Sequence, residues 1–265
     1  MSMVVRDVTR EVRAGAGSRR DRSARPGLVK KSAFGVSIRV ASTRCPAGDT
    51  TNSEPCTTSS SGIIGAMSAK PHDLRSELEH IIRADIRLGQ LLNAGRELNL
   101  PQWRLVAGCI YQTVWNKLTG RPPCTGINDY DLIYFDDRDL SKEAEAATEQ
   151  IVRERLSDLP APVDVRNQAR VHLWFQDYFG IPYAPLSCAD EAITRYASIT
   201  HAVGVRLTAD GRLDVYAPFG LEDIFAMIIR PNYALPNKPT HDRKAARAKA
   251  IWPQLTILDW LPGRS

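Results

Sequence analysis

Two acidic residues, Asp129 and Asp131, open an apolar stretch that runs to Phe135. The aromatic, aliphatic and β-branched residues that follow them are typical of a buried strand. On a strand, residues i and i+2 lie on one face with their Cα atoms roughly 6.6 Å apart, so the two carboxylates would repel each other. A divalent cation relieves that repulsion, and oxygen ligands suit Mg²⁺ or Mn²⁺. The pattern favours a metal site, with a strand that binds no metal as the alternative.

A second Asp-x-Asp pair, Asp137 and Asp139, follows shortly afterwards in an acidic turn. No apolar strand carries this pair, so we expect both side chains to be solvated. The difference in context, rather than the motif, singles out the first pair.

The segments around these acids show strand and helix patterns that would position them. Apolar residues at helical spacing predict helices between residues 74 and 98, and residues 103–106 read as a short strand. The small residues Ala107-Gly108-Cys109 then turn into a helix over 110–118. A glycine turn at a helix N-terminus presents backbone N–H groups, so Gly108 and Cys109 could bind a phosphate.

Downstream, the pattern predicts a solvated helix over 141–156, capped by Ser141, and then a short strand in which Asp164 lies between Val163 and Val165. Residues 202–207 and 213–216 read as strands, and the second of them contains Asp214. A basic helix over 239–252 carries four cations that we expect to form a solvated face, with a phosphate-facing role as the alternative. These are Arg243, Lys244, Arg247 and Lys249.

Composition separates residues 1–66 from the rest of the chain. They hold 11 of the 35 Lys and Arg residues and 5 of the 30 Asp and Glu residues, so the remaining 199 residues carry a net charge of −1. The low apolar content of residues 1–66 predicts that this segment is disordered or is a non-native extension, with Met67 as the natural start of a domain over 67–265. The near-neutral charge of that domain argues against long nucleic acid as a partner.

The cysteines and the hydropathy bear on the cellular compartment. The chain has 5 cysteines and no Cys-x-x-Cys, which favours a reducing cytoplasm over a disulfide framework. No run approaches 18 consecutive apolar residues, so we expect no membrane partner.

Taken together, the small-residue turn at 106–109, the Asp-Tyr-Asp-Leu strand at 129–132 and Val163-Asp164-Val165 resemble the DNA polymerase β-type nucleotidyltransferase superfamily. The block Asn167-Gln168-Ala169-Arg170-Val171-His172 is similar to a bacterial family of small nucleotidyltransferase-like proteins. The resemblance covers about residues 74–260. It implies an α/β (α+β) fold with a mixed sheet flanked by helices.

The resemblance also implies a reaction. Asp129, Asp131 and Asp164 would be catalytic and would hold two Mg²⁺ (or Mn²⁺) ions, and a nucleoside monophosphate would pass from a nucleoside triphosphate to an unknown acceptor with release of pyrophosphate. Arg170 would contact phosphate, because a guanidinium matches its geometry. Gly108-Cys109 departs from the usual Gly-Gly or Gly-Ser, and 20 residues separate Cys109 from Asp129, longer than is usual.

Three questions stay open at this point. The chain could be a catalytically inactive nucleotide- or partner-binding protein on the same fold, or a glycosyltransferase that uses Asp-x-Asp for a metal–nucleotide-sugar complex. Asp214 competes with Asp164 as the third carboxylate. Chain order favours Asp164, because a compact crossover brings its strand beside the Asp-x-Asp strand.

Overall fold

The computed structural model describes residues 73–263. The expectation for residues 1–66 lies outside this part of the chain. The two helices expected at the start are present, α2 (Leu74–Ala84) and α3 (Ile86–Leu98). Asp73 caps the first through its carboxylate, and Asp85 ends the first and caps the second. A single aspartate therefore divides the apolar pattern into two helices.

A five-stranded sheet forms the centre of the structure, in the order β3-β2-β1-β4-β5. Its strands are β1 (Arg104–Val106), β2 (Tyr130–Tyr134), β3 (Val163–Asn167), β4 (Gly204–Leu207) and β5 (Leu213–Tyr216). All neighbouring strands run antiparallel except β2 and β3, which are parallel. Parallel neighbours need a crossover connection, and α5 (Lys142–Arg155) supplies it. The sheet is therefore mixed and flanked by helices, as the sequence predicts.

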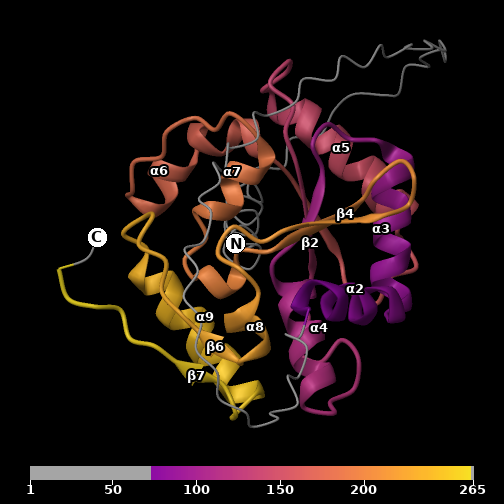
Figure 1. Ribbon diagram of the computed structural model, residues 1–265. Helices are drawn as coiled ribbons and strands as arrows, with labels where there is room; N and C mark the ends of the chain where they lie inside the picture. The colour runs from indigo at the N-terminus through magenta and orange to yellow at the C-terminus, as the bar shows by residue number, and fades with distance from the viewer. Residues whose placement is uncertain (1–72, 264–265) are drawn as a thin grey trace, which may run out of the picture. The chain divides into compact units, whose positions relative to one another are not determined.

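The two faces of the sheet differ in chemistry because side chains alternate along each strand. One face carries buried apolar residues such as Leu105, Leu132 and Val165, and α3 and α5 pack along the sheet on that side (Figure 1). The other face carries Asp131, Asp164 and several arginines, and the α7–α9 segments lie on its side in Figure 1.

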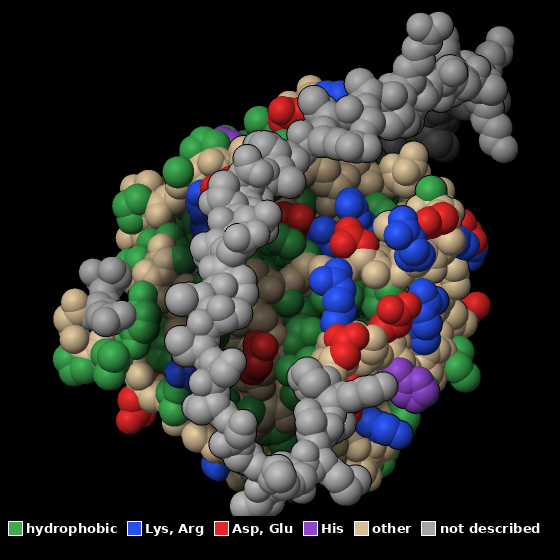
Figure 2. All heavy atoms as spheres, in the orientation of Figure 1, with side chains coloured by type: hydrophobic (Ala, Val, Ile, Leu, Met, Phe, Trp, Pro, Cys, Tyr) green, Lys and Arg blue, Asp and Glu red, His purple; other side chains and the backbone are tan. Residues whose placement is uncertain are grey.

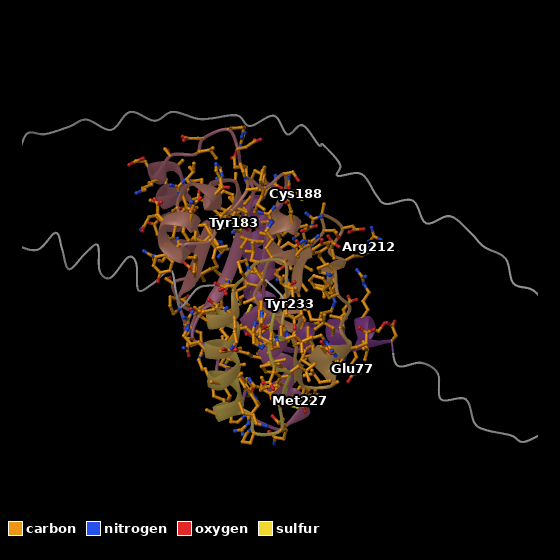
Figure 3. All side chains as sticks on the ribbon, turned by 90° about the vertical axis from the view of Figure 1, so that its left-hand side faces the viewer. Glu77, Tyr183, Cys188, Arg212, Met227 and Tyr233 are labelled. Atoms are coloured by element: carbon orange, nitrogen blue, oxygen red, sulfur yellow. The ribbon has the colours of Figure 1, made fainter. Side chains whose placement is uncertain are left out.

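The remaining elements complete the second side. They are α4 (Gly108–Leu118), the 3₁₀ helices η1 (Gln168–Leu173) and η2 (Ile199–His201), α6 (Phe175–Phe179), α7 (Ala189–Thr194), α8 (Glu222–Phe225), β6 (Ile228–Ile229), α9 (Lys238–Ile251) and β7 (Thr256–Ile257). Figure 3 views this side directly, and Tyr183, Tyr233 and Met227 follow one another down it.

Two local details differ from the sequence pattern. The segment after Asp164 stays extended to Asn167 before it turns helical, because β3 pairs with β2 along its whole length. A small parallel sheet of β6 and β7 also forms beside α9, in two-residue strands too short to show a periodic pattern. Among residues 73–263, no helix is both long enough and apolar enough to span a bilayer.

Candidate active site

Asp131 and Asp164 lie directly opposite each other on the parallel strands β2 and β3. In-register neighbours point to the same face of a sheet, with the strands about 4.8 Å apart. The two carboxylates therefore share one small region, which is the juxtaposition expected from chain order. Sequence reasoning found both residues from their apolar neighbours.

Burial and mutual repulsion disfavour the charged forms of these carboxylates. The pKa of Asp131 is raised, first by burial and further by the nearby Asp129, although Asp131 as a whole residue is only half-buried. The pKa of Asp164 is raised to about 7 by burial, with Asp131 and Glu149 contributing and Arg166 opposing. A cluster of acids whose pKa values rise in this way is typical of a functional site.

Asp129 stands just before β2, at the end of a loop that is anchored from the far end of the chain. Arg247 of α9 donates to the Gly126 carbonyl at 2.6 Å, and Trp252 lies so close to Gly126 that a side chain there would collide with its ring. Gly126 also has φ +78°, a conformation that favours glycine. The approach to Asp129 is therefore held by the last helix.

The turn at Ala107–Cys109 adjoins the acids, because Val106 pairs with Asp131. Ala107 has φ +56° and no side chain caps the N-terminus of α4, so the first backbone N–H groups are not satisfied by a capping side chain. Such groups suit an anion. The Cys109 thiol is buried and faces the Val106 carbonyl, so only the backbone of Gly108 and Cys109 could meet a phosphate.

Sequence reasoning missed Arg166. This residue stands two positions after Asp164 on the same face, and its Nη2 atom lies 2.6 Å from Asp164 Oδ1. Its Nη1 atom lies 3.6 Å from Glu149 of the crossover helix. The i, i+2 spacing on a strand was the signal available to find it.

Two other residues lie away from this cluster. Arg170 is buried, pairs with Glu145 and donates to the Leu140 carbonyl at 2.7 Å, so the structure does not bring it to the turn at Ala107–Cys109. Asp214 lies on β5, three strands from β2 and so about 14 Å away across the sheet. It pairs there with Arg206 and Arg104.

The basic helix α9 divides its four cations between two environments. Lys244 and Arg247 are half-buried, and Lys244 is close enough to lower the pKa of Asp131 while Arg247 lowers that of Tyr111 on α4. Arg243 and Lys249 are exposed, and Lys249 donates to the carbonyls of Pro253 and Leu255. The solvated face expected from the sequence therefore describes only part of this helix.

The acids fit a divalent cation in their chemistry. Carboxylate oxygens are the ligands that Mg²⁺ and Mn²⁺ prefer, and a bound cation would relieve the repulsion between the carboxylates of Asp129 and Asp131. Within residues 73–263, however, no three His, Cys, Asp or Glu side chains are grouped as a metal site. Asp164 forms its ion pair with Arg166 instead, and would have to change partners to join a metal held by the other two acids.

Comparisons with known proteins agree with this architecture. A family model described as nucleotidyltransferase matches residues 93–257. An NMR structure whose title reports a CCA-adding enzyme head domain aligns with TM-score 0.55 and 26% identity, covering 70% of this chain and 96% of that one. The search of curated proteins returned no match.

Full-length enzymes align less well. The Thermotoga maritima CCA-adding enzyme in complex with tRNA gives TM-score 0.42 and 16% identity over 69% of this chain, and a CCA-adding enzyme with CTP gives 0.42 and 15% over 71%. This chain spans only 42% and 44% of those two proteins. The match to the head domain confirms the expected polymerase β-type fold, and the family model covers more than half of the residues. The chain belongs to the nucleotidyltransferase family.

Proposed function

We propose that this protein transfers a nucleoside monophosphate from a nucleoside triphosphate to an acceptor and releases pyrophosphate, with a divalent cation. The observation that carries the proposal is the in-register pair of Asp131 and Asp164 beside the uncapped N-terminus of α4. The acids and the N–H groups that could bind an anion lie together where β1 ends and β2 and β3 begin, and a metal-bound triphosphate requires both kinds of group.

Each group has a role in this proposal. Asp129 and Asp131 would hold Mg²⁺ or Mn²⁺, which neutralises charge on the phosphates, and the backbone of Gly108 and Cys109 would orient the triphosphate. Asp164 lies on the far side of Asp131 from β1 and would face the acceptor hydroxyl. Positioning and charge neutralisation account for most of the catalysis in such a reaction.

Lys244 of α9 also supports nucleotide binding at this site. It is half-buried and lowers the pKa of Asp131, and no hydrogen bond or ion pair joins it to another residue of the described range 73–263. A cation so placed could meet the phosphates.

The net charge of −1 over residues 67–265 favours a small acceptor over long nucleic acid. We assign the reaction to a domain over 67–265 acting in the cytoplasm.

One observation favours a second candidate, a nucleotide-binding protein without turnover. The Asp164 carboxylate is already paired with Arg166, and the Cys109 side chain offers the phosphates nothing. In that case nucleotide would bind while no product forms.

Labelled nucleotide separates the two. Each α-labelled nucleoside triphosphate would be incubated with the full chain and Mg²⁺ or Mn²⁺, alone and with small-molecule extracts, and the products resolved. We expect label to move to an acceptor in wild type and in Asp137→Asn, which changes one of the two exposed acids of the second Asp-x-Asp pair, but not in Asp129→Asn. Nucleotide binding with no labelled product under any condition would instead support the inactive protein.

A further inference from the structure

The guanidinium of Arg166 contacts two carboxylates of the acidic cluster, those of Asp164 and Glu149. It lies 2.6 Å from Asp164 and 3.6 Å from Glu149, and its Nη1 also donates to the Val165 carbonyl at 3.0 Å. The side chains of Asp164 and Arg166 are 6% and 14% exposed. This is an ion pair built into the sheet face, unlike the solvated pairs on the surface.

The influence of Arg166 extends beyond Asp164. It lowers the pKa of both Asp131 and Asp164, opposing the effect of burial at each. Its Nε atom is buried and has no hydrogen-bond partner among the described residues. One arginine therefore supplies positive charge to two carboxylates on neighbouring strands, which is also what a bridging metal ion would do.

The consequence concerns how many metal ions the site takes. We propose that Arg166 is a resident cation that stands in place of a second divalent ion, so that the protein binds one divalent cation, at Asp129 and Asp131. This rests on the proposed function, because it assumes that those two acids hold metal. Arg166 is a positioning residue in this arrangement, since it keeps Asp164 beside the metal site and out of the metal's ligand shell.

The alternative is that the pair only stabilises the fold. Breaking a buried pair by removing one partner destabilises a protein by about 3–5 kcal/mol, so a purely structural pair would show its loss in the melting temperature alone. A cation substitute predicts something further. Without Arg166, the charges of Asp131 and Asp164 are left together while Glu149 keeps its pair with Arg153, and the two aspartates should attract a divalent ion.

Mn²⁺ binding measures this directly. Free Mn²⁺ would be followed by electron paramagnetic resonance during titration of the full-length chain without nucleotide. We expect wild type to bind one Mn²⁺ per chain, and Arg166→Gln to gain a second site or to bind about tenfold more tightly. Arg138→Gln is the matched control, because Arg138 also pairs with an acid two positions away, Asp136, but is exposed. It should behave as wild type.

A second variant keeps the test decisive if Arg166→Gln does not fold. Asp164→Asn should leave the Mn²⁺ stoichiometry and affinity of wild type unchanged, whereas Asp131→Asn should abolish binding. The inference would be overturned by any of three results: two Mn²⁺ ions in wild type, unchanged Mn²⁺ binding in a folded Arg166→Gln, or loss of Mn²⁺ in Asp164→Asn. If wild type still transfers nucleotide, such a result leaves the proposed function standing. Mn²⁺ binding in no variant, together with no transfer, would overturn the proposed function as well.

Discussion

The two ends of the sheet's polar face both contain arginine–aspartate networks, yet they differ in charge balance. At the β4–β5 end, Arg104 pairs with Asp190 and Asp214, and Arg206 pairs with Asp214. Two cations meet two acids there. At the β2–β3 end, Arg166 pairs with Asp164 and Glu149, and the carboxylates of Asp129 and Asp131 lie nearby. The other cations that act there come from helices: Arg153 of α5 also pairs with Glu149, and Lys244 of α9 lowers the pKa of Asp131.

In the proposed function, this difference distinguishes a structural network at β4–β5 from a catalytic one at β2–β3. A balanced network needs nothing from outside, and Arg104 is tied down further by lying over the ring of Tyr216. An excess of negative charge on buried and half-buried acids is unfavourable in the folded protein alone, because desolvation and repulsion both act against it. Such an arrangement makes physical sense where a metal ion or a cationic group completes it. Figure 2 shows acidic and basic side chains interleaved over the side of the molecule where β4 and β5 lie.

The largest effect should follow from exchanging one acid at each end. We expect Asp131→Asn to lower nucleotide transfer by about 10³-fold or more, because metal binding is lost, and to leave the melting temperature equal or higher because repulsion is relieved. Asp214→Asn should do the opposite, keeping transfer and lowering the melting temperature. Single-turnover rates and thermal melts of both variants decide whether the two ends are different in kind.

Asp164 should show a more selective loss. Asp164→Ala is expected to lower kcat by about 10²-fold while the Kd for nucleotide changes less than tenfold, since the proposed metal and triphosphate contacts remain. Transfer that persists in Asp164→Ala and collapses in Asp214→Ala would place the third carboxylate on β5 instead.

Arg104 tests the stability of the balanced end. Arg104→Met removes a cation whose side chain is 5% exposed and leaves the two acids partly buried, so we expect a loss of about 2–3 kcal/mol, or ~5–10 °C in Tm. Transfer per folded molecule should not change. Arg212→Met, which removes an exposed pair with Asp210, is the matched control and should leave the melting temperature nearly unchanged.

The acidic end should also make stability depend on pH. The raised pKa of Asp164, about 7, means that below pH 7 the folded chain holds a proton that the unfolded chain loses near the ordinary carboxyl pKa of 3.8. In metal-free buffer the melting temperature should therefore fall as pH rises from about 4 to 7 and then level off. The slope should be smaller in Asp164→Asn, and an unchanged slope would assign the pH dependence to other groups.

Lys244 should give the smallest change. Lys244→Ala is expected to raise the Kd for nucleoside triphosphate about threefold to tenfold, because one half-buried cation near the phosphates is lost. Lys249→Ala, on the outer part of α9, should leave nucleotide affinity unchanged. Equal effects in the two variants would indicate a general charge effect of the helix.

The sequence was most informative where neighbouring residues in the chain decide the structure. Asp131 and Asp164 could be found because apolar residues flank each acid, and Ser141 because a helix cap is local. The partners of those acids could not be found, because they depend on pairing across strands and on helix packing. Arg166 contacts Glu149 only because α5 packs against β3, and Arg170 pairs with Glu145 of the same helix instead of reaching the turn at Ala107–Cys109.

The orientation of α9 shows the same limit. Its sequence has cations all along one stretch, and nothing in the spacing says which of them face the sheet. Packing decides that, because the residues that α9 buries are Thr240, His241, Ala245 and Ala248. Lys244 is thereby brought inward and Lys249 kept outside.

The anchoring of Gly126 by Arg247 and Trp252 has a consequence for the order of events during synthesis. The ribosome delivers the acidic strand well before α9, and domains generally form from the N-terminal side as they emerge. The loop that leads to Asp129 nevertheless needs a carbonyl partner and a ring supplied more than 120 residues later. The nascent chain would thus carry Asp129 and Asp131 without their final geometry until the last helix docks.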